Sequence, residues 1–101
     1  MSKMFAMTLD EILAKVRAHE SELRDLRVRE LALFGSYARG DAISTSDMDF
    51  VVDFDEKSFD NYMGVRELLE RLFARKIDLV LKSAIKPRLR EQILREAVRA
   101  A

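Results

Sequence analysis

The chain has 101 residues, enough for one domain, and its content of 49% hydrophobic and 36% charged residues, with three glycines and one proline, excludes collagen-like, low-complexity and intrinsically disordered proteins. It contains no cysteine, which excludes a disulfide framework, a thiolate zinc site and a cysteine nucleophile, and a cytoplasmic location is expected. Eighteen basic and eighteen acidic residues give a formal net charge of zero, so we expect no strong direct nucleic-acid binding. No apolar run is long enough to indicate membrane insertion, and the N-terminal pattern does not indicate secretion.

The first predicted helix begins after Thr8. Thr8 and Glu11 have the spacing of a capping box, in which each side chain accepts a hydrogen bond from the backbone of the other residue. An apolar stripe at helical spacing predicts the face that covers a core, formed by Leu9, Ile12, Leu13, Val16 and Leu23. A break is expected near His19, and the pattern leaves the end of this helical region open between residues 19 and 26.

Two strands on either side of a glycine-bounded turn are predicted next. The short apolar run 31–34 is typical of a buried strand, and Gly35 ends it. Residues 35–40 predict a tight turn that leads into one or two helical turns and stops at Gly40. In residues 47–54 the even positions are all apolar, so they face the core, while Asp47 and Asp49 project from the opposite face.

The second half of the chain predicts a helix over residues 59–75, a strand over 77–81 and a last helix that begins at Pro87. The apolar face of the 59–75 helix consists of Tyr62, Val65, Leu68, Leu69, Leu72 and Phe73. The last helix is expected to direct Leu89, Ile93, Ala97 and Val98 inward. This alternation predicts a single α/β domain over residues 1–101, with a small mixed three-stranded sheet and helices packed mainly on one face.

Three aspartates form the most informative cluster of candidate functional residues. Asp47 and Asp49 stand at positions i and i+2 of one predicted strand, with Cα atoms about 6.5–7 Å apart and side chains on the same face. Asp78 interrupts the apolar strand 77–81 with a charge that would be costly to bury unpaired. Oxygen ligands without histidine or cysteine favour Mg²⁺, so the sequence predicts a magnesium site at these carboxylates.

Gly35 and Ser36 suggest a phosphate-binding turn opposite the aspartates. A glycine at the end of a strand lets the backbone approach a phosphate closely, and the first N–H groups of a following helix favour an anion. The Ser36 hydroxyl adds a further donor. Together with the aspartates, this turn is typical of a site that holds a nucleoside triphosphate bridged by Mg²⁺ for attack on phosphorus.

The combined pattern resembles a known family. Gly35-Ser36-Tyr37-Ala38-Arg39-Gly40, a five-residue spacer and Ser46-Asp47-Met48-Asp49 are similar to the G-S-x-x-R-G and S-D-x-D motifs of the minimal nucleotidyltransferase (MNT) antitoxins, which belong to the DNA-polymerase-β-like superfamily. The resemblance covers essentially the whole chain, and Asp78 falls at the place of the family's third acid. It implies a nucleotidyltransferase core of the α+β type.

The resemblance also implies an activity and a partner. MNT antitoxins are paired with ribonuclease toxins of the HEPN type, and the implied reaction transfers AMP from ATP to a tyrosine hydroxyl of that toxin and releases pyrophosphate. By residue-for-residue matching, Gly35 and Ser36 would hold the β and γ phosphates, and Asp47 and Asp49 would hold two Mg²⁺ ions. Asp78 would hold one of these ions and take the proton from the attacking hydroxyl.

Several alternatives remain open at this stage. The chain could neutralise the toxin by binding and occlusion without catalysis, or transfer a nucleotide to a small molecule or an RNA end. Arg39 is expected either to neutralise phosphate charge or to form an ion pair with Asp41 or Asp47. Tyr37 is expected either to stack on the nucleotide base or to pack within the protein, and Asp78 could be a surface acid paired with a lysine.

Charge is distributed unevenly along the chain. Residues 41–60 contain seven acids and one base, and residues 82–101 contain six bases and two acids, so the local charges are −6 and +4. Such segregation is found at docking surfaces, although a plain surface distribution would look the same. The basic C-terminal segment, with Leu94 and Val98, is a candidate docking helix for the partner.

Overall fold

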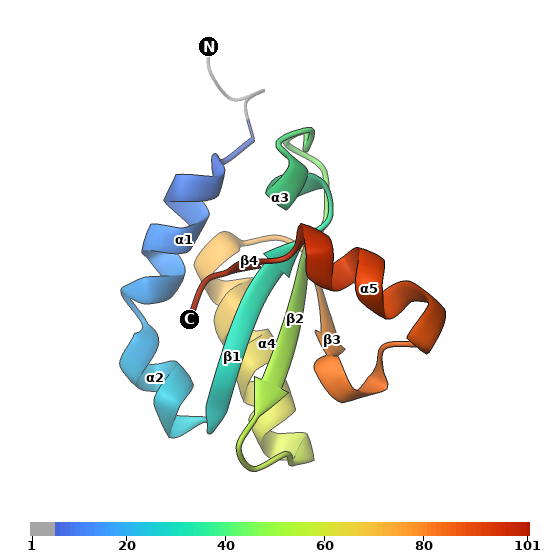
Figure 1. The fold of residues 1–101 in the computed structure, drawn as a ribbon. Coiled ribbons are helices and arrows are strands. Elements are labelled where there is room, and N and C mark those ends of the chain that lie inside the picture. Colours follow the sequence, from blue (N-terminus) through green and yellow to red (C-terminus); the bar gives the residue numbers. More distant parts are fainter. Residues whose placement is uncertain (1–5) are drawn as a thin grey trace.

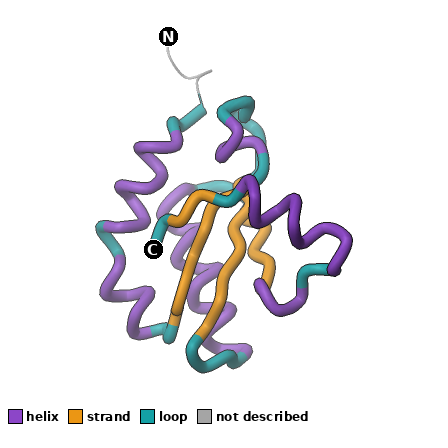
Figure 2. Tube along the Cα trace, viewed as in Figure 1, coloured by secondary structure: helices purple, strands orange, loops and turns teal. Residues whose placement is uncertain are grey.

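The computed structural model describes residues 6–101, which form a twisted sheet with helices on both of its faces (Figures 1 and 2). In chain order the elements are α1 (Leu9–Arg17), α2 (Glu20–Asp25), β1 (Val28–Phe34), α3 (Ser36–Arg39), β2 (Met48–Phe54), α4 (Phe59–Phe73), β3 (Ile77–Leu81), the 3₁₀ turn η2 (Lys82–Ala84), α5 (Pro87–Glu96) and β4 (Val98–Arg99). The expectation that the N-terminus carries no secretion signal rests partly on residues 1–5, outside the described residues. Within residues 6–101, no helix is both long and apolar enough to cross a membrane.

The predicted N-terminal cap of α1 is present. The Glu11 backbone N–H donates to Thr8 Oγ1 at 3.2 Å, and the Thr8 N–H donates to Glu11 Oε1 at 2.8 Å, so two N–H groups of the first turn are satisfied. The helical region breaks where the sequence suggested, because α1 ends at Arg17 and α2 begins at Glu20, with His19 at its N-cap. Ile12, Leu13 and Val16 are buried on the predicted face.

Over residues 6–101 the sheet has four strands in the order β3-β2-β1-β4, so the expectation of three strands was incomplete. β1 runs antiparallel to both β2 and β4, while β2 and β3 are parallel. The missed strand is β4, where Val98 pairs with Leu33 and the Ala100 N–H donates to the Leu31 carbonyl at 2.8 Å. Placing Val98 in the last helix was wrong because α5 ends at Glu96 and the backbone at Ala97 is already extended. A strand of two residues has no period of its own that the sequence could reveal.

The main core lies between the sheet and the helices α1, α2 and α4. It contains the predicted even positions of β2, and the rings of Phe50 and Phe73 stack with centroids 6.2 Å apart. In Figure 1, α4 runs behind the sheet, while α1 and α2 lie beside β1. The prediction that helices cover mainly one face is therefore confirmed, since α1, α2 and the longest helix, α4, share this core.

The opposite face of the sheet is covered only in part, by α5. Ala32, Val51 and Ile85 form a small second core there, against which Ile93 and Ala97 pack. Leu89, which was expected to point inward, is 42% exposed, because α5 contacts the sheet mainly through its C-terminal half. Asp49 and Asp53 alternate with the buried Val51 on β2 and so lie on this partly open face.

Candidate active site

Three chain segments meet at one end of the sheet. Because β1 is antiparallel to β2, and β3 is parallel to β2, the end of β1 lies beside the beginnings of β2 and β3. The register places Phe34 opposite Asp49, and Asp49 opposite Asp78. The turn that begins at Gly35 and two of the predicted aspartates are thereby brought together, although they come from distant parts of the sequence.

Gly35 lies directly against the carboxylate of Asp49. Its backbone has φ 76° and ψ −153°, a conformation that residues with a side chain rarely adopt, and a Cβ atom added there would overlap Asp49 Oδ2. The turn continues into the single helical turn α3 and closes at Gly40, which has φ 86° and whose N–H donates to the Ser36 carbonyl at 2.9 Å. Only glycine at position 35 allows this close approach of backbone and carboxylate.

Asp49 is the most perturbed acid of the site. Burial, the negative charge of Asp78, hydrogen bonding to Asp78 and the charge of Asp47 together raise the pKa of Asp49 from 3.8 to about 6, and the nearby Arg39 partly offsets this rise. Like charges at close range disfavour ionisation of both groups unless a proton or a cation lies between them. The Asp49–Asp78 pair is thus a place where a positive charge would be stabilised.

Asp47 belongs to the same end of the sheet but is directed differently. It lies just before β2, is exposed, and its Oδ2 is 3.9 Å from the ammonium nitrogen of Lys76. Within the described range 6–101, no group of three or more acidic or histidine side chains is arranged so that it could hold a metal ion. The expected trio is therefore present as a close pair, Asp49 and Asp78, with Asp47 beside it and paired with a lysine.

Arg39 forms ion pairs within the protein. Its Nε lies 3.3 Å from Asp41 Oδ2, and its Nη1 lies 3.2 Å from Oε1 of Glu96 at the end of α5. The ion pair with Asp41 was one of the two alternatives suggested by the sequence, whereas the contact with Glu96 was not predicted. These contacts hold the guanidinium at the rim of the site, where its charge still lowers the pKa of Asp49.

Comparison with known proteins places this geometry in a family. The sequence model of the nucleotidyltransferase domain family matches residues 16–100. The chain belongs to this family. It is also 43% identical over 97 residues to the protein adenylyltransferase MntA of Thermococcus cleftensis, with 94% of this chain and 98% of the relative covered. The resemblance suggested by the glycine-serine and aspartate motifs is therefore confirmed.

Solved structures agree with this assignment. A structure assigned provisionally as a minimal nucleotidyltransferase has a TM-score of 0.79 and 35% identity, and covers 91% of this chain and 95% of its own. A toxin–antitoxin structure with AMP-PNP has a TM-score of 0.69 at 21% identity, with 85% and 72% covered. A tri-AMPylated Shewanella oneidensis HEPN toxin in complex with MNT antitoxin has a TM-score of 0.62 at 19% identity, with 87% and 70% covered. The last two similarities establish the shared fold.

Tyr37 of this nucleotidyltransferase packs within the protein, so the alternative of stacking on a nucleotide base is not supported. It is only 2% exposed, and its hydroxyl donates to the Ile43 carbonyl at 3.4 Å. Sequence reasoning missed three neighbours of the site, namely Arg75, Lys76 and Glu96. The first two could have been suspected, because they directly precede the strand that carries Asp78.

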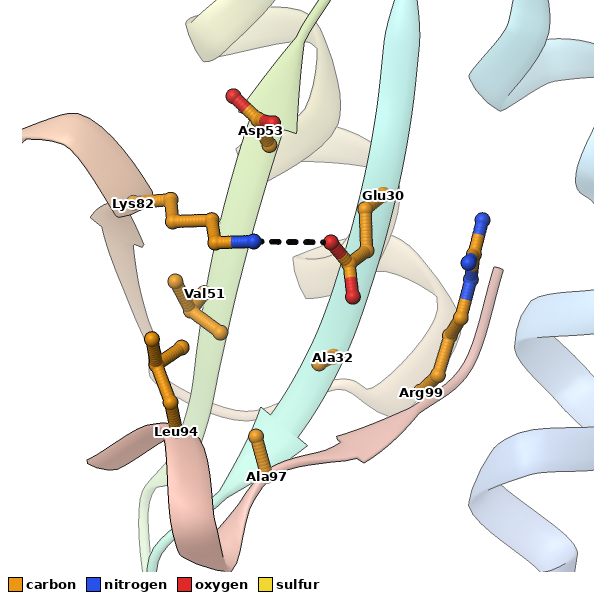
Figure 3. Close-up of a pocket in the computed structure, with 8 residues that line it drawn as sticks. All are labelled: Glu30, Ala32, Val51, Asp53, Lys82, Leu94, Ala97 and Arg99. Atoms are coloured by element: carbon orange, nitrogen blue, oxygen red, sulfur yellow. Dashed lines mark hydrogen bonds and ion pairs between the residues drawn. The ribbon is translucent and has the colours of Figure 1, made fainter. Parts of the chain in front are cut away.

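A separate cavity of about 220 Å³ lies between α5 and the open face of the sheet (Figure 3). Its apolar lining includes Val51 of β2 and Leu94 of α5. Three of its charged side chains form ion pairs, since Lys82 Nζ lies 3.2 Å from Glu30 Oε1 and Asp53 Oδ2 lies 3.3 Å from Arg29 Nη1, while the fourth, Arg99, donates to the backbone carbonyls of Ala101 and Arg29. Leu94 lines this cavity and also an open groove along α5 with Pro87, Arg90, Glu91 and Arg95, so its part in a docking helix stays a prediction, whereas Val98 packs against the main core.

Proposed function

We propose that the chain is an antitoxin that transfers AMP from ATP to a tyrosine hydroxyl of a HEPN ribonuclease partner and releases pyrophosphate. The observation that carries this proposal is the Asp49–Asp78 carboxylate pair pressed against the Gly35 turn. Support comes from the relative named a protein adenylyltransferase and from structural neighbours that are toxin–antitoxin complexes, one with AMP-PNP and one with an AMPylated HEPN toxin.

The Gly35–Ser36 turn is the proposed holder of the β and γ phosphates. Gly35 has no side chain between the turn and Asp49, so a phosphate chain can pass close to both. The partly exposed Ser36 offers a hydroxyl donor at the same place. Arg39, held at the rim by Asp41 and Glu96, adds positive charge near the position of the triphosphate.

The carboxylates fit a divalent cation. All donors are oxygens, which suits Mg²⁺, and burial together with the charge of Asp78 raises the pKa of Asp49, so a cation bound between these carboxylates would be stabilised. Asp49 and Asp78 would hold the first of two ions, and Asp47 would join them when its carboxylate turns away from Lys76. When bound, such ions neutralise the charge that develops on the phosphates during transfer.

The reaction is a displacement at the α phosphorus of ATP. The tyrosine oxygen of the partner forms a bond to this phosphorus, and the bond from the α phosphorus to the oxygen bridging to the β phosphorus breaks, so pyrophosphate leaves with that electron pair. The phenolic proton goes to the Asp78 carboxylate, which is exposed and can be reached by an incoming protein. Asp49, more buried, remains on the side of the nucleotide.

The decisive experiment follows the α phosphate. The purified chain is incubated with Mg²⁺, a candidate HEPN partner protein, and ATP labelled on either the α or the γ phosphate. We expect the partner to carry label from α-labelled ATP only, with one pyrophosphate released for each AMP transferred. A partner whose tyrosines are replaced by phenylalanine should stay unlabelled.

Two results would contradict the proposal. Absence of labelling with every nucleotide and divalent ion would exclude transfer to this partner. Alternatively, a variant with both Asp47→Asn and Asp49→Asn that still protects cells from the toxin would show that neutralisation works by occlusion. Glu67→Gln, which changes an exposed acid on α4, serves as the matched control and should label the partner as the wild type does.

A further inference from the structure

Arg75 is placed between the three segments that carry the proposed active-site residues. It lies in the short connection from α4 to β3, three positions before Asp78. Its side chain contacts Tyr37, the residue of α3 that follows Ser36, and Ser44 in the loop that leads to Asp47.

The contacts of Arg75 use most of its guanidinium group. Nη1 donates to the Tyr37 hydroxyl and, at 3.4 Å, to the Ser44 carbonyl, while Nε donates at 3.3 Å to the Phe73 carbonyl near the end of α4. The guanidinium carbon also lies 5.6 Å from the centroid of the Tyr37 ring, within cation–π distance. One planar group therefore holds α3, the loop and the end of α4 at fixed relative positions.

Tyr37 extends this arrangement toward Asp47. Its hydroxyl donates to the Ile43 carbonyl, which also accepts the Ser46 N–H at 2.9 Å in the turn just before Asp47. The Ile43 N–H in turn donates to Ser46 Oγ at 3.0 Å. Because Tyr37 is buried, the ring cannot move without displacing both α3 and this turn.

We propose that Arg75 is a positioning residue that sets the distance between the phosphate-binding turn and the aspartates, an inference that rests on the proposed function. In this role Arg75 does not touch the nucleotide. It acts through Tyr37 and the Ser44 carbonyl, and so keeps Gly35 against Asp49 while β3 presents Asp78. A displacement of the reacting groups by about 1 Å is enough to slow an enzyme about a hundredfold, so such a brace has a large effect on transfer.

The test compares Arg75→Met, Arg75→Lys and Tyr37→Phe with the control Arg71→Met, which removes an exposed arginine of α4 that pairs with Glu22. For Arg75→Met we expect the KM for ATP to rise severalfold and kcat to fall, with the KM for the acceptor protein unchanged. Arg75→Lys and Tyr37→Phe should show intermediate changes, because each retains part of the contact. A further variant, Arg75→Ala, lacks the guanidinium group, and millimolar free guanidinium should partly restore its transfer rate.

A second measurement does not depend on activity. Amide hydrogen exchange of residues 36–46 should be faster in Arg75→Met than in the wild type and in Arg71→Met, and the affinity for AMP-PNP should fall. If the wild type transfers no AMP but this exchange pattern appears, the proposed function fails and the brace stands. If exchange and both KM values match the wild type, and only the folded fraction is lower, Arg75 has a purely structural role and the inference is overturned.

Discussion

Replacing Asp49 by asparagine should stabilise the fold while abolishing AMP transfer. In the absence of a cation, the ionised Asp49 is opposed by burial and by the charges of Asp78 and Asp47, which raise its pKa from 3.8 to about 6. Each pKa unit corresponds to about 1.4 kcal/mol, so this rise sets an upper limit of about 3 kcal/mol. Because the carboxylate is partly exposed, solvent screening reduces the expected gain to about 1–2 kcal/mol at pH 7.5.

The sign of the pH dependence follows from the direction of the shift. An acid whose pKa is higher in the folded than in the unfolded protein favours folding when protonated. The contribution of Asp49 is therefore fully present below its unfolded pKa of 3.8 and is lost as the pH rises to about 6. The wild type should lose stability across this interval, and Asp49→Asn should lack this loss.

Urea unfolding in EDTA between pH 4 and pH 8 measures both effects. In thermal unfolding, the same gain of about 1–2 kcal/mol in the free energy of unfolding corresponds to a rise of Tm of about 5–10 °C for a domain of this size. Addition of Mg²⁺ should raise the Tm of the wild type and leave that of Asp49→Asn unchanged, since an ion that binds only the folded state stabilises it. Equal stability of the two proteins in EDTA at pH 7.5, with parallel pH profiles, would refute the argument that crowded carboxylates oppose folding; Glu67→Gln is the charge-matched control.

Three further substitutions test separate parts of the structure. Gly35→Ala places a side chain at φ 76° and against Asp49, so it should lower the free energy of unfolding in urea by about 1–3 kcal/mol and should also abolish AMP transfer. An active variant that is as stable as the wild type would contradict the geometry of the turn. Phe50→Ala removes a fully buried ring and should lower the free energy of unfolding by about 3–5 kcal/mol, whereas a loss below 1 kcal/mol would mean that the core around Phe73 is not packed as described. Thr8→Ala should lower it by about 1 kcal/mol through the lost cap and leave the KM for ATP unchanged, and a change in that KM would link α1 to the site.

Local patterns in the sequence determined much of the fold. The spacing of Thr8 and Glu11 predicted the cap of α1, and the alternation along β2 predicted which residues enter the core. The glycines at positions 35 and 40 predicted the turn between them, since each has the positive φ that only glycine adopts easily. These features depend on residues a few positions apart, so a period of two or 3.6 residues is enough to reveal them.

The tertiary structure alone decided which of these segments meet. The parallel register of β2 and β3 makes Asp49 and Asp78 a pair, whereas Asp47, two residues away, pairs with Lys76. Tertiary structure likewise decided the pairing of β4 with β1, the ion pair between Glu96 and Arg39, and the hydrogen bond from Arg75 to the Tyr37 hydroxyl. Contacts between residues distant in the sequence depend on strand order, register and side-chain packing, and no repeat along the chain records them.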